Sequence, residues 1–195
     1  MGAVRDYGYD SGSVFTKRLP NKQKTACYNT WIDVIQRCYS DKWKNKHETY
    51  KGVTLCKEWH DYQIFALWYY RNYKEGHQID KDILSDYYNV TPVYSPKTCR
   101  MVPRDINMLL VNRVGKSRNN DLPLGVCKSS NGGFITYCNN GEGKTLNLGT
   151  TYCVQDASKL YVDFKEGLIK SKAKYYLDKG ILDSTLYDAL ISYKV

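Results

Sequence analysis

LGVCKSSNGGFITYCNNGEGKTLNLGTT, residues 124–151, is the stretch of this chain with the clearest fold signal. Two Asn-Gly pairs, at 131–132 and 140–141, are typical of tight hairpin turns and divide the stretch into segments of strand composition. Those segments are 125–130, 133–139 and 144–149. The sequence therefore predicts three antiparallel strands joined by two short turns.

Successive side chains of a strand point to opposite faces, so the middle segment has two distinct sides. Phe134, Thr136 and Cys138 share one side, and Ile135, Tyr137 and Asn139 share the other. A helix is expected from about residue 154, because apolar residues recur there at helical spacing. One side of the sheet must cover this helix and the other can contact a partner. The pattern alone does not decide which side does which.

Upstream of residue 112 the apolar period is mostly that of helices. The spacing of Trp31, Val34, Ile35 and Cys38 predicts a helix over 26–39. Further helices are expected over 59–73 and 104–111, and strand-prone segments over 53–56, 79–84 and 98–102. Together these predict an α+β protein, with N-terminal helices and a strand–strand–helix motif, then a three-stranded antiparallel sheet packed on a helix.

Changes in composition divide the chain into five parts. Residues 1–24 are polar and end in a basic cluster, which is typical of a flexible arm, and residues 113–123 form a basic break. The expected parts are a basic arm at 1–24, an N-terminal domain at 25–112, a basic linker at 113–123, a sheet domain at 124–170 and a C-terminal helical extension at 171–195, which Gly180 interrupts.

The composition limits the class of partner. Twenty-nine Lys and Arg against 20 Asp and Glu give a net charge of +9, which favours a partner that carries phosphate, nucleic acid above all. The 19 tyrosines offer rings that pack in a core or stack on bases. No run of 18 apolar residues and no apolar signal segment is present, so we expect neither a membrane span nor a secretory signal.

The seven cysteines form no CxxC pair, and a chain without a secretory signal is expected to keep its thiols reduced. A structural Zn²⁺ held by Cys38, Cys56, Cys99 and His60 is one hypothesis. Buried thiols that pack as small apolar groups are the favoured interpretation.

A set of spaced motifs runs through residues 25–112. They are Trp31 with Arg37-Cys38-Tyr39, Tyr50-Lys51-Gly52-Val53-Thr54-Leu55-Cys56 with Trp59, Ile79-Asp80-Lys81-Asp82, and Tyr94-Ser95-Pro96-Lys97-Thr98-Cys99-Arg100 with Asn107. In this order they resemble phage-encoded HNH-type endonucleases, the ββα-metal nucleases that often act as homing enzymes. The resemblance implies one divalent cation, Mg²⁺ or Mn²⁺, with Asp80 and Asn107 as its ligands and the scissile phosphate as its target.

The same resemblance leaves the general base unassigned. Lys81 stands where the family has its base histidine, and Thr98 where it has an orienting asparagine. An unperturbed lysine has a pKa of about 10.4 and is a poor base at neutral pH, so Lys81 would need a lowered pKa or would bind the phosphate instead. The alternatives are Asp82, which strand alternation places on the face of Asp80, then His77, and Tyr94 as a group that orients water.

A second set of motifs covers residues 122–168. It comprises Leu124-Gly125-Val126, Gly133-Phe134-Ile135, Leu148-Gly149-Thr150, Asp156-Ala157 and Tyr161. This set resembles the APETALA-type (ethylene-response-factor-like) DNA-binding domain, a three-stranded sheet on one helix whose sheet enters the major groove. The contact candidates that the resemblance implies are Lys128, Tyr137, Asn139, Lys144 and Asn147. In the linker, where like charges cluster, the candidates for phosphate contact are Arg113, Lys116 and Arg118.

The two resemblances predict a phage-type, site-specific, metal-dependent endonuclease of double-stranded DNA that works in the cytoplasm of an infected bacterial host. The missing histidine favours an alternative, a catalytically inactive, sequence-specific DNA-binding protein (a repressor or origin-binding factor) derived from such a nuclease. A recombinase accessory arm is a third, weaker hypothesis. The DNA target, the number of strands cut and the oligomeric state stay open at this level.

Overall fold

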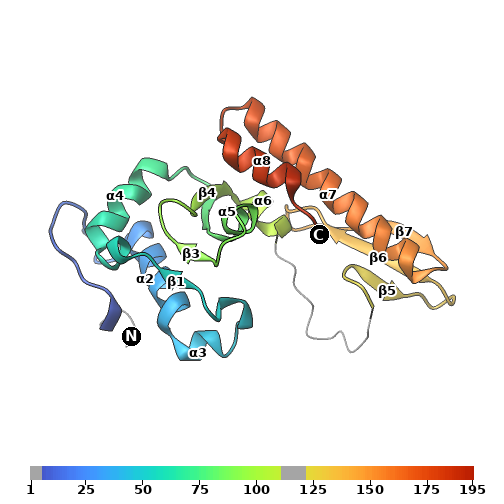
Figure 1. Ribbon diagram of the computed structural model, residues 1–195, viewed down its shortest axis with the longest axis horizontal. Helices are drawn as coiled ribbons and strands as arrows, with labels where there is room; N and C mark the ends of the chain where they lie inside the picture. The colour runs from blue at the N-terminus through green and yellow to red at the C-terminus, as the bar shows by residue number, and fades with distance from the viewer. Residues whose placement is uncertain (1–5, 111–121) are drawn as a thin grey trace. The chain divides into compact units, whose positions relative to one another are not determined.

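A computed structural model describes residues 6–110 and 122–195, and the chain forms two compact units, Met1–Met101 and Val102–Val195 (Figure 1). The predicted α+β class is confirmed. The first unit contains α2 (Ala26–Tyr39), α3 (Asp41–Lys44), the 3₁₀ helices η1 (Glu48–Tyr50) and η2 (Lys57–His60), α4 (Tyr62–Asn72), α5 (Asp82–Tyr87), β1 (Thr54–Leu55), β2 (His77–Asp80) and β3 (Val93–Tyr94). The second contains α6 (Arg104–Leu110), β5 (Val126–Lys128), β6 (Phe134–Asn139), β7 (Thr145–Thr151), α7 (Val154–Asp178) and α8 (Ser184–Ser192). The division between the units falls within β4 (Arg100–Pro103).

Aromatic side chains on α2 and α4 make the core of the first unit. Trp31 and Tyr62 are almost fully buried, with ring centroids 5.5 Å apart, and Trp59 meets Phe65 edge-on at 5.1 Å. The Trp31 indole N–H donates to the backbone carbonyl of Trp59, 2.8 Å away, so the buried polar atom is satisfied. The helix predicted over 26–39 is confirmed, and part of the tyrosine content belongs to this core rather than to a nucleic-acid surface.

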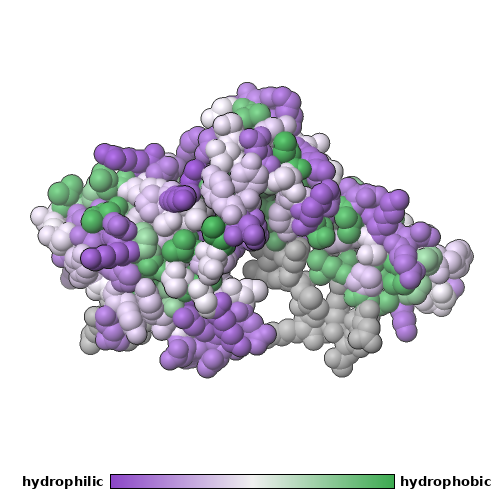
Figure 2. Space-filling view, viewed as in Figure 1, coloured by the Kyte–Doolittle hydropathy of each residue, from purple (hydrophilic) through white to green (hydrophobic). Residues whose placement is uncertain are grey.

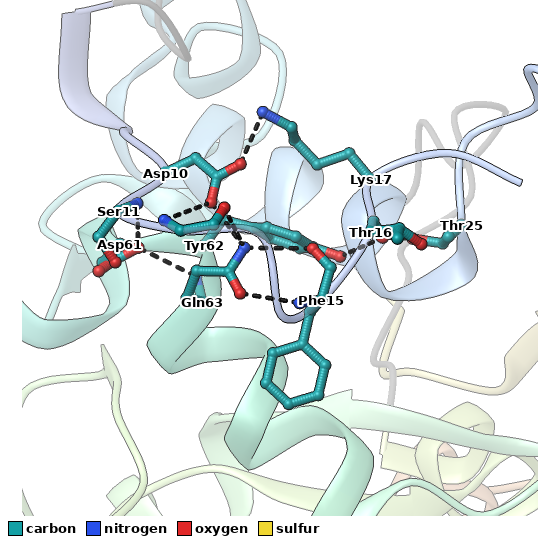
Figure 3. A network of polar contacts seen from close by, with 10 residues as sticks. Asp10, Ser11, Phe15, Thr16, Lys17, Thr25, Asp61, Tyr62 and Gln63 are labelled. Carbon is teal, nitrogen blue, oxygen red and sulfur yellow. Dashed lines mark hydrogen bonds and ion pairs between the residues drawn. The ribbon is translucent and has the colours of Figure 1, made fainter.

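The prediction of a flexible arm at 1–24 is wrong for residues 9–17, which bond to the first unit, whereas residues 18–24 are exposed (Figure 3). The Gln63 amide nitrogen donates to Asp10 Oδ1 and to the carbonyls of Gly12 and Phe15, and its oxygen accepts from the Phe15 N–H. Asp61 Oδ1 accepts from the Ser11 N–H and also caps α4 at Gln63. These long-range bonds order a segment whose own sequence is typical of a tail.

The first unit also has two short two-stranded sheets, one of which includes β4 at the division between the units. β1 and β3 pair in parallel, and β2 pairs with β4. The strand predicted over 79–84 is wrong after Asp80, because residues 82–87 form α5. Asp80 Oδ1 accepts from the backbone N–H groups of Asp82 and Ile83, which starts the helix at that point. Asp82 therefore lies in a helix and does not share a strand face with Asp80.

The antiparallel sheet β5–β6–β7 of the second unit is confirmed, with both predicted turns. α7 packs on the side of β6 that carries Thr136 and Cys138, where the Thr136 hydroxyl donates to the Ala157 carbonyl at 3.1 Å (Figure 1). The pairing passes from Thr136↔Gly149 to Tyr137↔Asn147, so Leu148 is an extra residue in β7. This bulge interrupts the simple alternation expected for 144–149.

Two predicted boundaries differ in the structure. α7 is one continuous helix over 154–178, so residues 171–178 belong to it rather than to a separate extension, and α8 folds back beside its C-terminal half (Figure 1). α6 was expected to end an N-terminal domain at 112, but it belongs to the second unit. Lys172 of α7 pairs with Asp105 of α6 at 2.6 Å and with Glu142 at 2.8 Å, and these contacts attach α6 to the sheet module.

None of the helices within residues 6–110 and 122–195 is both long and apolar enough to span a membrane.

Candidate nucleic-acid interface and catalytic residues

The side of the sheet that faces away from α7 is now identified. Because Thr136 and Cys138 point to α7, the intervening Tyr137 and the following Asn139 point to the opposite side. Cross-strand register places Asn147 beside Tyr137 and Thr145 beside Asn139. Seven residues make up this surface, which we call the open face: Cys127, Ile135, Tyr137, Asn139, Thr145, Asn147 and Thr150. Three of the five predicted sheet contacts therefore lie together.

The two asparagines of the open face are held by their oxygens. Asn139 Oδ1 accepts from the Gly141 N–H at 2.6 Å, and Asn147 Oδ1 accepts from the Gly149 N–H at 2.9 Å. Both side chains are exposed, and within the described residues neither Nδ2 group has a protein hydrogen-bond partner. The turns thus hold each carboxamide by its oxygen and leave its Nδ2 group available to a partner. Such a donor can bind acceptor atoms on phosphates or base edges.

The remaining predicted DNA contacts lie elsewhere. Lys128 pairs with Phe134 in register and so shares the α7 side of the sheet, although it is exposed. Lys144 is exposed in the turn before β7, where its backbone N–H donates to Asn140 Oδ1. Arg113, Lys116 and Arg118 lie outside the described residues.

Asp80, the predicted metal ligand of the first unit, also has a structural role as the cap of α5. Burial is the main cause that raises the pKa of this carboxyl to about 6, and the nearby charge of Asp82 adds to it. The two hydrogen bonds that Oδ1 accepts from backbone N–H groups lower the pKa and so oppose the effect of burial. The carboxyl is therefore mostly ionised at neutral pH, and its second oxygen is the atom suited to a hard cation.

Lys81 is not placed as a general base. Its ammonium group is buried, pairs with Asp82 Oδ1 at 2.5 Å and lies 4.9 Å from the centre of the Tyr50 ring. A base must reach water or substrate, whereas this ammonium is buried and its ion pair occupies Asp82 as well. Neither residue suits the role that the sequence left open.

Thr98 holds a turn instead of orienting a reacting group. The side chain is buried, and its hydroxyl donates to the Val93 carbonyl at 2.5 Å and contacts Ser95 Oγ at 2.8 Å. These bonds close the loop between β3 and β4. Asn107, the second predicted ligand, is half-buried on α6, in the unit that follows the division of the chain, whereas Asp80 precedes it.

The other base candidates, His77 and Tyr94, are buried at the atoms that would react. His77 Nδ1 lies 3.0 Å from the Glu75 carbonyl, so it carries the proton, and the buried Nε2 has no hydrogen-bond partner within the described residues. Tyr94 is almost fully buried, and its hydroxyl accepts from Arg37 at 3.2 Å. Neither side chain is exposed to a water that it could activate.

The hypothesis of a zinc site at Cys38, Cys56, Cys99 and His60 finds no cluster: within residues 6–110 and 122–195, no three His, Cys, Asp or Glu side chains gather as metal ligands. Burial raises the pKa of Cys38 to about 12 and that of Cys56 to about 11, which keeps these thiols protonated. His60 Nδ1 donates to the Cys56 carbonyl, so Nε2 accepts from the Tyr39 hydroxyl at 2.9 Å. The imidazole is accounted for by hydrogen bonds.

Sequence reasoning missed a buried lysine in the second unit. Lys165 lines a cavity of about 390 Å³ beside Tyr137 and Asn139, and its ammonium lies 3.1 Å from the Tyr161 hydroxyl. Burial lowers the pKa of Lys165. Its position four residues after Tyr161, on the apolar side of α7, is the signal that could have identified it.

No family model matches the chain, and no curated protein or solved structure matches it either.

Proposed function

We propose that this protein binds double-stranded DNA through the open face of the β5–β6–β7 sheet. The observation that carries the proposal is the pairing of Tyr137 with Asn147, next to Asn139 and Thr145, on the side away from α7. Antiparallel strands can enter the major groove, and the amide donors of the open face suit acceptors on phosphates and purine edges. A net charge of +9 supports a polyanionic partner.

Two conservative variants test the open face. Asn139→Asp and Asn147→Asp keep the oxygen that each turn requires but replace the outward NH₂ donor with a second carboxylate oxygen. We expect each to bind duplex DNA about 5- to 100-fold more weakly than wild type, with an unchanged melting temperature. Wild-type protein is first used to enrich duplexes from a random-sequence library. The affinities of wild type and variants are then measured on the library and on the enriched duplexes.

Asn29→Asp is the matched control, because Asn29 is exposed on α2 and the substitution changes the charge by the same amount. If Asn139→Asp and Asn147→Asp both bind duplex DNA with wild-type affinity, the open face is not part of the DNA interface. Absence of duplex binding by wild type would overturn the function itself.

A second function, metal-assisted cleavage of the bound DNA, is favoured by the order of elements. β2 ends at Asp80 and pairs with β4, and α6, which carries Asn107, comes directly after β4; α5 and β3 are inserted between the two strands in the chain. Two paired strands followed by a helix match the strand–strand–helix order that the HNH-type resemblance implies. The Asp80 carboxylate and the Asn107 carboxamide each offer an oxygen of the kind that suits Mg²⁺ or Mn²⁺. Such a cation would stabilise the charge that develops on the scissile phosphate.

Asp80→Asn is the sharpest catalytic variant, since it keeps the oxygen that caps α5 and removes only the charge. We expect cleavage of duplex DNA with Mg²⁺ or Mn²⁺ to fall about 100-fold or more in Asp80→Asn and in Asn107→Ala. Asp86→Asn, an exposed position of α5, is the control. Duplex binding without cleavage in any divalent metal would favour the inactive DNA-binding protein instead.

A further inference from the structure

Two cations meet the same tyrosine rings in the first unit. Arg37 of α2 lies 5.8 Å from the centre of the Tyr50 ring, and Lys81 lies 4.9 Å from it. Arg37 also donates from Nη1 to the Tyr94 hydroxyl at 3.2 Å, and Lys81 lies 5.6 Å from the Tyr94 ring. The rings hold both charges in fixed positions through cation–π contact.

The two cations differ in their partners. Lys81 is neutralised by Asp82, 2.5 Å away. Arg37 forms no ion pair with a carboxylate in the described part of the chain, and its Nε is a buried donor without a hydrogen-bond partner there. A buried N–H donor without a partner is costly, and proteins normally satisfy such a group with a hydrogen-bond partner or a bound anion.

The chain beside Arg37 is positively charged. The segment after α2, residues 40–51, carries four lysines against Asp41 and Glu48, and Glu48 is already paired with Lys51 at 3.0 Å. Figure 2 shows hydrophilic residues over α3, which belongs to this segment. Arg37 is half-buried as a residue, its Nε is buried, and its Nη1 is held by the Tyr94 hydroxyl, so the protein fixes the guanidinium. A fixed guanidinium beside a lysine-rich segment favours the binding of an anion.

We propose that Arg37 is a phosphate-binding residue that holds a backbone phosphodiester of duplex DNA, with Tyr50 and Tyr94 fixing the plane of its guanidinium. The planar fork of arginine matches two phosphate oxygens, which a lysine cannot do. A contact of this kind adds affinity and positions the duplex but does not read its sequence. The inference rests on the proposed duplex binding and adds a contact in the first unit to the open face of the second.

The test compares Arg37→Gln, Arg37→Lys and Arg71→Gln with wild type, over a range of salt concentrations and on random-sequence duplex. We expect Arg37→Gln to bind about 5- to 30-fold more weakly. Its slope of log affinity against log salt should be smaller by about one, because one phosphate contact fewer releases counterions. Arg37→Lys should recover part of the affinity, and the enriched sequence should not change.

Arg71→Gln is the matched control, because Arg71 is exposed on α4. An Arg37→Gln variant that binds duplex with the wild-type affinity and salt slope would overturn the proposal. If Arg37→Gln does not fold, the Arg37 Nε–H signal of wild type is followed by NMR during titration with duplex. A shifted signal supports the contact, and an unmoved signal overturns it.

Inorganic phosphate separates failure of this site from failure of the proposed function. A wild-type protein that ignores duplex DNA, but whose Arg37 Nε–H signal moves with phosphate at constant ionic strength, has an anion site and no DNA function. A signal that moves with neither probe removes the site.

Discussion

Polar side chains in the first unit mainly bind that unit's own backbone, whereas those on the open face of the second unit direct their donors outward. Asp80 caps α5, Thr98 closes the turn before β4, and Gln63 holds residues 10–15. By contrast, Asn139 and Asn147 use one oxygen for a turn and keep their donors on the sheet surface. A polar residue in a motif therefore indicates a binding site only when nearby backbone groups leave some of its hydrogen-bonding capacity unused.

Gln63→Ala gives the largest expected effect, because Gln63 is the centre of the polar network in the first unit (Figure 3). Four hydrogen bonds to residues 10–15 are lost, so the free energy of unfolding should fall by about 2–4 kcal/mol. Urea denaturation measures this change. Gln36→Ala, a half-buried glutamine on α2, is the control, and an equal loss in both variants would contradict the role given to Gln63.

Gly8→Ala tests how closely the N-terminal segment approaches α2. A methyl group at Gly8 would lie 2.6 Å from Ile35 Cδ1 and 2.7 Å from the Trp31 ring. Both side chains are buried and cannot move easily, so we expect a loss of about 1–3 kcal/mol in unfolding free energy. At Gly12 the nearest atom would be 3.7 Å away. Gly12→Ala should therefore leave the urea midpoint unchanged, and a similar loss there would refute the argument.

Lys172→Met removes the ion pairs that Lys172 of α7 makes with Asp105 of α6 and with Glu142. Partial burial alone would lower the pKa of Lys172. The hydrogen bonds to Asp105 and Glu142 raise this pKa by a larger amount, so the net shift is upward. The contribution of the lysine charge is therefore present at neutral pH and is lost as alkaline pH removes the Lys172 proton. We expect a loss of about 1–2 kcal/mol, measured by thermal unfolding.

Lys174→Met is the control for this prediction. Lys174 makes an exposed pair with Asp178 one turn away, and such pairs contribute little. Equal melting temperatures for the two lysine variants would show that the contacts of Asp105 and Glu142 do not hold α6.

Asp80→Asn has the smallest expected effect on stability, and its sign is opposite. Because burial raises the pKa of Asp80 to about 6, the folded state binds the proton more tightly than the unfolded state. The ionised carboxyl thus costs stability above that pH, and the penalty disappears as pH falls below about 4. With metal removed by chelator, Asp80→Asn should be more stable by about 1 kcal/mol at pH 7.5 and equal to wild type at pH 4.

Urea curves at the two pH values measure the effect, with Asp188→Asn on the exposed side of α8 as control. A variant that is less stable than wild type at pH 7.5 would show that the Asp80 charge, and not only its oxygen, supports α5.

Several features of the fold were predictable from neighbouring residues. The Asn-Gly turns, the helix over 26–39 and the helix after residue 154 follow from patterns that act over a few positions. The strand predicted over 79–84 failed because capping of α5 by Asp80 competes with strand propensity, and propensity for strands depends strongly on context.

For the candidate site, the residue types that alternate along β6 and the net charge of +9 follow from the sequence. The shared position of Tyr137 and Asn147 on the open face needs the folded chain, because α7 covers one side of β6 and a bulge at Leu148 sets the register. Only tertiary structure ordered residues 9–17, through a bond from Gln63 to Asp10 that spans 53 positions. Contacts at such separation depend on the folded geometry and leave no periodic pattern in the sequence.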